Sequence, residues 1–243
     1  MNPRLTAATT RRVLEQIRHD PRTVGLLLVV PSLLIGLMAW IFNDGRLFSA
    51  VGPDLLGLFP FIIMFLITSI TTLRERRSGT LERLMTTPLG RFDFIVGYAI
   101  AFGLLAVVQS LIAVGFAVWV CGLSVQGNAW LLVLVAVANA LLGTTLGLFA
   151  SAFAATEFQV VQFMPLLVFP QALLGGIFVP RDRMPDVLRA ISDWLPLTHA
   201  IEAFQHAAGT TDSGSVLREV AVVLAWAVAF TALGSVTLRR RTA

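Results

Sequence analysis

Three side chains near the end of the chain have the types and spacing of metal ligands. His199, Glu202 and His206 fall on one face of a predicted helix, where two imidazoles and a carboxylate could hold zinc. Their order matches neither the HExxH pattern of zinc proteases nor its inverted form. A hydrogen-bonded surface face is therefore the default interpretation, and we expect no metal site. Because no Ser/His/Asp or paired-carboxylate arrangement stands out either, the sequence does not predict catalytic residues.

The basic residues exclude nucleotide hydrolysis by the usual phosphate loop. All 18 are arginine, and the GxxxxGK[ST] loop requires a lysine to contact the phosphates. We therefore expect no ATP hydrolysis by this chain, no cofactor on it, and a separate subunit for any ATP-driven role. The one cysteine, Cys121, is interpreted as a small core residue, since it cannot form an intrachain disulfide or a thiolate cluster.

The elements that position these residues are membrane spans. The chain of 243 residues is 56% hydrophobic, and its mean hydropathy is +0.82. About 20 apolar residues cross a bilayer as a helix, and continuous rather than alternating apolar runs favour helices over a barrel. Six such runs predict six transmembrane helices, at residues 24–42, 55–73, 94–121, 129–155, 158–179 and 220–238.

The arginines predict the orientation of these spans. The N-terminal segment, the connection between spans 2 and 3 and the C-terminal tail together carry most of them, whereas Arg46 and four in the connection between spans 5 and 6 lie on the other side. The positive-inside rule places both termini and residues 74–92 in the cytoplasm. The expected location is the plasma (inner) membrane, and the pI of 10.8 is not interpreted as nucleic-acid binding.

The densest charged segment, residues 75–90, lies between spans 2 and 3. Ser78 or Thr80 could cap a short helix there, and Pro88 would end it. One face of that helix is apolar and consists of Leu81, Leu84 and Met85. This face could dock in a groove of a partner protein or pack on the inner leaflet, and the spacing alone leaves both open.

Three further segments have structural signatures. Residues 10–20 read as an amphipathic helix on the membrane surface, with a frayed tail as the alternative. Pro165 and Pro170 predict a kinked or broken span 5, while Gly143 and Gly147 allow close helix packing in span 4. The long connection between spans 5 and 6 predicts two short amphipathic helices that form an external lid. Their apolar faces are Met184, Val187, Leu188, Ile191 and Leu195, and then Leu197, Ala200, Ile201, Phe204 and Ala207.

Two motifs resemble those of one transporter family. Gly79-Thr-Leu-Glu82 followed by Thr87-Pro88 is similar to the cytoplasmic motif of ABC-2 type exporter permeases, and Gly175-Gly-Ile-Phe-Val-Pro180, Met184-Pro185 and Leu195-Pro-Leu197 follow in the matching order. With six spans and an N-terminal amphipathic helix, the resemblance covers nearly the whole chain. It is closer to drug-efflux permeases than to polysaccharide exporters.

The resemblance implies a dimer of six-span subunits, an expected homodimer, driven by two ATPase subunits that bind ATP and Mg²⁺. The segment 80–87 would be the coupling helix on the ATPase, and the expected coupling residues are Arg76, Thr80, Leu81, Glu82, Leu84, Met85, Thr87 and Pro88. The expected extracellular gate is Gly175, Gly176, Phe178, Pro180, Met184, Pro185 and Pro196. A pathway along the dimer axis would be lined by Phe61, Phe65, Gln162, Phe163 and Phe169.

The function expected from these observations is ATP-driven export of a lipophilic drug, lipid or glycolipid. Polysaccharide or lipid-linked glycan export is the alternative. An ion-coupled carrier is disfavoured because every acid and arginine lies outside or at the edge of the six runs. A non-transporting membrane anchor is disfavoured by the broken span 5 and the lid.

The predicted fold class is an all-α membrane protein. It is expected to form a single transmembrane domain over residues 1–243, in which residues 1–23 form the cytoplasmic interfacial helix and residues 24–179 form spans 1–5. Residues 180–215 would be the extracellular helical hairpin, and residues 216–243 would be span 6 with its basic tail. Membrane lipid and a small hydrophobic substrate are the other expected contacts, and nucleic acid is not.

Overall fold

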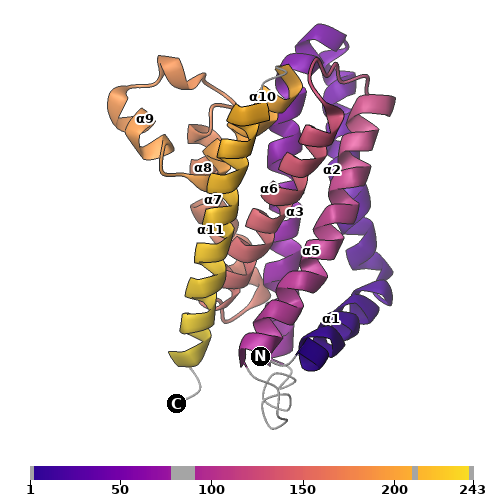
Figure 1. The fold of residues 1–243 in the computed structure, drawn as a ribbon, viewed down its shortest axis with the longest axis vertical. Coiled ribbons are helices and arrows are strands. Elements are labelled where there is room, and N and C mark those ends of the chain that lie inside the picture. The colour runs from indigo at the N-terminus through magenta and orange to yellow at the C-terminus, as the bar shows by residue number, and fades with distance from the viewer. Residues whose placement is uncertain (1–2, 78–90, 210–212, 241–243) are drawn as a thin grey trace.

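The computed structural model describes residues 3–77, 91–209 and 213–240, and these residues form helices and no strand. The helices stand side by side as an elongated bundle (Figure 1). In chain order they are α1 (Pro3–Arg18), α2 (Pro21–Phe42), α3 (Gly45–Arg77), α5 (Arg91–Gly115) with a π-helical turn η1 (Phe116–Val120), α6 (Ala129–Ser151), α7 (Glu157–Leu167), α8 (Phe169–Leu174), a 3₁₀ turn η2 (Arg181–Arg183), α9 (Asp186–Ser192), α10 (Pro196–Gly209) and α11 (Ser213–Arg240).

Six of these elements are long and apolar enough to cross a membrane, as the sequence predicted. They are α2, α3, α5 with η1, α6, α7 with α8, and α11. The second differs most from its prediction, because α3 begins at Gly45 and not near Leu55. Only Asn43 and Asp44 separate it from α2, so the turn between the first two spans is very short.

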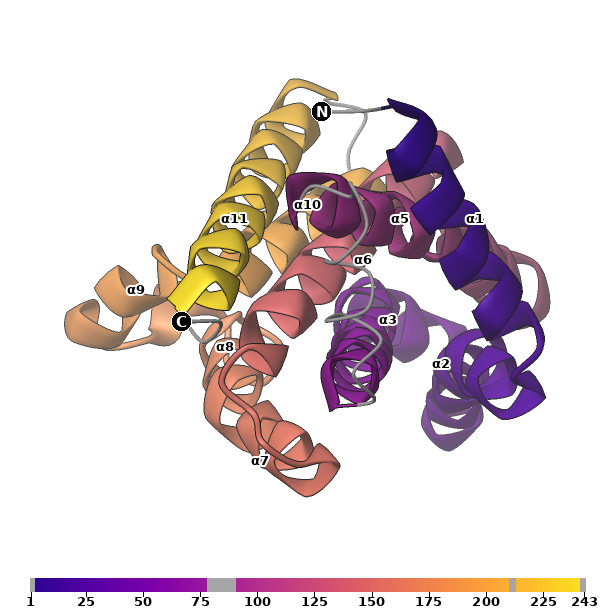
Figure 2. The same cartoon turned by 90° about the horizontal axis from the view of Figure 1, so that it is seen from below.

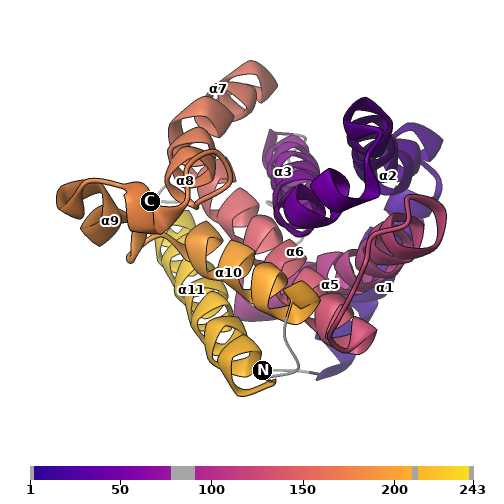
Figure 3. The same cartoon turned by 90° about the horizontal axis from the view of Figure 1, so that it is seen from above.

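The bundle has two distinct ends. Helix α1 lies obliquely across one end of the bundle, the end at which α11 finishes, and α10 lies across the other (Figures 1 and 3). We name them the α1 end and the α10 end. The arginine pattern predicts that the α1 end faces the cytoplasm.

Helix α1 is amphipathic, as predicted, but it begins at Pro3, well before residue 10, and its apolar face packs on other helices of the chain. Val13 and Ile17 are buried against α2, α3 and α5, and Figure 2 shows α1 crossing over α5 and α2. The crossing is close because Gly97 has no side chain: a Cβ there would lie 2.8 Å from Cβ of Thr9. Thr10 Oγ1 donates to the Gly97 carbonyl at 3.1 Å and adds a polar contact to the same crossing.

Asp20 connects α1 to α2 as the N-cap of the second helix. Its carboxylate accepts from the hydroxyl of Thr23 at 2.7 Å and from the backbone N–H groups of Arg22 and Thr23. These hydrogen bonds to the charged form lower the pKa of Asp20, the Thr23 hydroxyl contributing most. The cap fixes where α2 begins, and thereby the angle between the surface helix and the first span.

The centre of the bundle is the packing of α3 against α6. A Cβ on Gly143 would lie 2.7 Å from the carbonyl oxygen of Phe61, and one on Gly147 would lie 2.6 Å from that of Phe65. The two glycines therefore allow the backbones to approach closely, which favours dispersion contacts where lipid offers little hydrophobic driving force. The predicted role of this glycine pair in helix packing is confirmed, and its partner is α3.

The fifth span is broken, as its prolines predicted. It divides at Val168 into α7 and α8, with Pro165 inside α7 and Pro170 in the first turn of α8. The Leu167 carbonyl at the break accepts a hydrogen bond from Gln171 Nε2 at 2.6 Å. Gln171 thus supplies a donor where the helical ladder is interrupted, which lets the break stay in an apolar environment.

Two short helices follow, α9 and α10, as expected for the connection between spans 5 and 6. The predicted apolar face of α10 is buried against α3, α6 and α11. The face predicted for α9 is not buried within the chain, since Val187 is 72% exposed and Leu188 and Ile191 are also exposed. Figure 3 shows why: α9 projects sideways from the bundle, whereas α10 lies over it.

Candidate functional site

The C-terminal turn of α3 is the best candidate for a functional site because it contacts four other helices. Its last residues before the segment 78–90 are charged, and successive residues of a helix point to different sides. Arg74 reaches α7, Glu75 reaches α1 and α5, and Arg76 reaches α6. We call these three residues the α3 hub.

The buried part of the hub joins α3 to the surface helix. Arg12 Nη2 donates to Glu75 Oε2 at 2.9 Å and to the Tyr98 hydroxyl at 3.0 Å. The Glu75 side chain is 5% exposed and that of Arg12 is 34% exposed. A carboxylate that is so enclosed is strongly disfavoured without a cation, so the pair fixes which face of α1 meets α3.

The other two hub residues lie nearer the surface. Arg74 forms a two-pronged ion pair with Glu157 at the start of α7, with N···O distances of 2.7 and 3.0 Å. Both side chains are about half exposed, so this pair adds little stability. Arg76 Nη1 donates to the Ser151 carbonyl at the end of α6. The end of α3 is therefore attached to α1, α6 and α7 by polar contacts.

Of the predicted coupling residues, only Arg76 is described. Thr80, Leu81, Glu82, Leu84, Met85, Thr87 and Pro88 lie outside the described residues. Arg76 is anchored to α6, so the end of α3 is tied to its neighbour one residue before the described part of the helix ends at Arg77. The sequence did not predict Arg12, Glu75 and Tyr98 as site residues. The signal that could have indicated Glu75 was its position between two arginines at the end of an apolar run.

The predicted pathway residues occupy two different environments. Phe61 and Phe65 are fully buried where α3 packs on the α6 glycines, so within this chain they do not face an open path. Their aromatic type gave no indication of this, because both core and pathway positions in a membrane bundle are apolar. Gln162 and Phe169 are exposed, and Phe163 is half-buried. A pathway along α7 and α8 remains a proposal that rests on these three.

The predicted gate residues surround the junction of α8 and α10. Packing favours glycine at position 175, since a Cβ there would lie 2.8 Å from the backbone carbonyl oxygen of Gln171 and would also meet the Ile201 side chain. Gly176 has φ of +95°, a conformation that other residues rarely adopt. The remaining gate residues differ in burial: Pro196 is buried, Met184 is half-buried, and Phe178, Pro180 and Pro185 are exposed.

One acid lies deeper than the sequence indicated. Asp54 was expected at the edge of an apolar run, but α3 begins earlier and places it in the third turn, where it is 5% exposed. Gln205 of α10 donates to its carboxylate at 2.8 Å. Both residues border a cavity of about 430 Å³ at the α10 end, together with Arg181 and Glu202.

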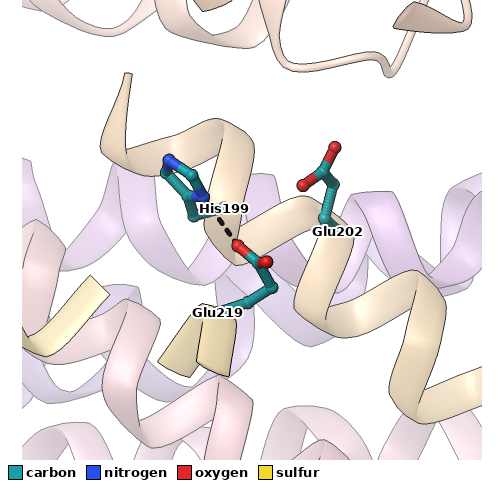
Figure 4. A group of neighbouring side chains, drawn as sticks. All are labelled: His199, Glu202 and Glu219. Carbon is teal, nitrogen blue, oxygen red and sulfur yellow. Dashed lines mark hydrogen bonds and ion pairs between the residues drawn. The ribbon is translucent and has the colours of Figure 1, made fainter. Parts of the chain in front are cut away.

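The predicted His199, Glu202 and His206 face is altered by a neighbouring helix. Figure 4 shows His199 and Glu202 on α10 next to Glu219 of α11. The candidate ligand atoms of these three residues lie within 4.8 Å of one another, and His206 is not in the group. Glu219 replaces His206, which sequence spacing could not show because Glu219 comes from a different helix.

Comparison with known proteins gives one family match. The model of the family described as ABC-2 type transporter matches residues 4–208. The chain is 27% identical over 149 residues to the probable multidrug ABC transporter permease YbhR of Escherichia coli K12, covering 61% of this chain and 40% of that protein. It is 26% identical over 145 residues to the inner membrane transport permease YhhJ of the same strain, covering 59% and 39%.

A third relative comes from a different bacterium. The chain is 27% identical over 188 residues to the linearmycin resistance permease protein LnrN of Bacillus subtilis strain 168, covering 74% of this chain and 48% of that protein. The chain therefore spans less than half the length of each of these three relatives.

Proposed function

Because this chain belongs to the ABC-2 type transporter family, we propose that it is the membrane subunit of an ATP-driven exporter. Its matched residues are those of a permease and not of an ATPase. The proposed substrate is a lipophilic drug, lipid or glycolipid moved outward across the plasma membrane, with the α1 end in the cytoplasm. The observation that carries the proposal is the α3 hub, which ties the last described turn of α3 to four other helices.

The hub provides a physical route from a partner to the membrane spans. A partner ATPase that moves the segment 78–90 would pull on the end of α3. Helix α3 has 33 residues and runs from the hub to the α10 end, a length of about 50 Å at 1.5 Å per residue. There Gly57 packs against Phe204, and Asp54 contacts Gln205 of α10. Motion at one end would reach the other through a single continuous helix.

Two ATPase subunits and a second permease, expected to be a second copy of this chain, complete the proposed transporter. The exposed side chains of α7 and α8 suit a partner in the membrane: Phe158 is 72% exposed, Leu166 66% and Leu173 57%. Lipid would also cover such an apolar surface. The exposed Gln162 on the same helix supports a second copy of the chain at this position. An exposed amide favours a protein or a polar pathway over lipid.

The substrate class is proposed from the spans and from the relatives' names. Two of the relatives are named for multidrug transport and for linearmycin resistance, which favours drug-like molecules over polysaccharide. Glycan export remains the second candidate. Asp54 adds one acid to the interior, but its carboxylate is engaged by Gln205, so it gives an ion-coupled carrier little support.

The test expresses the chain with a candidate ATPase subunit and measures ATP-dependent efflux of a lipophilic dye from cells, or its ATP-dependent uptake into inside-out vesicles. Leu84→Asp and Glu82→Arg should abolish efflux and ATPase co-purification while expression stays normal. Val187→Asp is the matched control, since this side chain is 72% exposed at the α10 end and should leave co-purification unchanged. Normal efflux with both loop variants would contradict the proposed coupling.

A further inference from the structure

The group formed by His199, Glu202 and Glu219 lies at the α10 end and is separate from the α3 hub. His199 and Glu202 are three residues apart on α10 and so project from one face. Glu219 lies in the second turn of α11, which packs against α10. The three side chains converge between the two helices (Figure 4), and their candidate ligand atoms lie within 4.8 Å of one another.

The two ring nitrogens of His199 both face oxygen atoms that accept hydrogen bonds. Nε2 is 3.0 Å from the backbone carbonyl of Asp193, and Nδ1 is 2.6 Å from Oε2 of Glu219. A neutral imidazole has one N–H and can satisfy only one of them. Both oxygens can only accept, so we consider the tautomer with its N–H on Nε2, which donates to the Asp193 carbonyl. The lone pair of Nδ1 then faces a carboxylate, a contact that requires a cation or a second proton between them.

This orientation is typical of a metal-binding histidine. Histidine ligands usually donate their other N–H to a carbonyl or carboxylate, which fixes the tautomer and aims the free nitrogen at the metal. Here the Asp193 carbonyl has that role. We propose that His199 Nδ1 and the carboxylates of Glu202 and Glu219 bind a divalent transition-metal ion of the zinc class.

The donor set and the charge suit such an ion. One imidazole nitrogen and two carboxylates are common zinc ligands, with water completing a tetrahedron. Two carboxylates also balance a charge of +2. Tetrahedral ligands of zinc lie about 3.3 Å apart at the usual bond lengths of about 2.0–2.2 Å. On metal binding, the distance between His199 Nδ1 and Glu219 Oε2 must therefore increase from 2.6 Å, and the longest distance within the group, up to 4.8 Å, must decrease. Rotation of the partly exposed side chains allows both changes.

Arg181 is the one cation that competes for this group among the described residues. Its Nη1 contacts Oε1 of Glu202, and its Nη2 contacts Asp193. Oε2 of Glu202 remains available to an ion. The 430 Å³ cavity borders both Arg181 and Glu202 and offers a route of access from the α10 end. A bound ion would connect α10 to the last span and stiffen that end of the bundle.

The experiment titrates the purified full-length chain, stripped with a chelator, in detergent. Zn²⁺ binding is followed by calorimetry, and Co²⁺ serves as a spectroscopic probe whose visible bands report tetrahedral nitrogen and oxygen ligation. We expect one ion per chain. His199→Gln and Glu219→Gln should weaken binding at least tenfold.

The matched control is His206→Gln, which removes the other histidine of α10 and should leave one ion bound. Helical circular dichroism and gel filtration without metal verify that each variant is folded. The Co²⁺ spectrum of the unmodified chain tests the site even if a variant fails to fold. Absence of tetrahedral bands in that chain, or equal loss of binding in His206→Gln and His199→Gln, would overturn the proposal in favour of a histidine–carboxylate ion pair alone.

Discussion

Removing the cation that contacts Glu75 should destabilise the bundle more than any change at its neighbouring surface pair. In Arg12→Gln the Glu75 carboxylate stays 5% exposed but loses its guanidinium partner. Breaking a fully buried pair in this way costs about 3–5 kcal/mol. Because a third of the Arg12 side chain reaches the surface, we expect a lower value, about 2–3 kcal/mol.

The reverse change is expected to be milder. Glu75→Gln leaves Arg12 charged, but that side chain can turn toward water, so we expect a loss of about 1–2 kcal/mol. The double variant removes both charges of the pair. Its loss should therefore be smaller than the sum of the two single losses, by about 1–3 kcal/mol.

Arg11→Gln provides the matched control. Arg11 is the adjacent residue of the same helix, and it pairs with Glu15 on the surface, where the two side chains are 83% and 55% exposed. A pair so exposed to solvent contributes little to stability. The assay is thermal unfolding of the full chain in detergent, where 1 kcal/mol corresponds to about 2–4 °C for a chain of this size. A loss for Arg12→Gln equal to that of Arg11→Gln, or strict additivity in the double variant, would refute the buried-pair argument.

Two further predictions concern the spans. Gly147→Ala should lower the unfolding temperature by several degrees, because the new Cβ would meet the α3 backbone at 2.6 Å. Gly25→Ala, where nothing lies within 4 Å of the new Cβ, should change the unfolding temperature by a degree or less. Equal effects of the two variants would contradict the close packing of α3 and α6. In a Cys121→Ala background, Phe169→Cys should react with a membrane-impermeant thiol reagent in at least one nucleotide state and Phe61→Cys should not, since Phe169 is 48% exposed and Phe61 is buried. Protection of position 169 in every state would place the pathway on other helices.

Features that depend on local chemistry could be predicted from the sequence. The six spans follow from hydropathy alone, because about 20 apolar residues in lipid must form a helix wherever they occur. The break in span 5 follows from Pro165 and Pro170, which cannot complete the helical ladder. The buried faces of α1 and α10 followed from their alternation of polar and apolar residues. These helices lie at the ends of the bundle, where the side of a helix that faces water is polar and the side that faces the protein is apolar.

Inside the membrane both the buried side and the lipid-facing side of a helix are apolar, so the sequence could not separate core from surface residues. Helices α3 and α7 both carry phenylalanines in their apolar stretches, yet Phe61 is buried and Phe158 is 72% exposed. Only the position of each helix in the bundle decides which side meets lipid. The same reason explains why two aromatic residues proposed for a pathway lie in the core.

The polar contacts that define the two candidate sites were decided by tertiary structure alone. Glu75 meets Arg12, 63 residues earlier, and His199 meets Glu219, 20 residues later on a different helix. Spacing along one helix suggested His206 as the third member of the second group, and packing of α11 against α10 supplied Glu219 instead. A sequence fixes which residues share a helical face, but the partner of that face is set by how the helices pack.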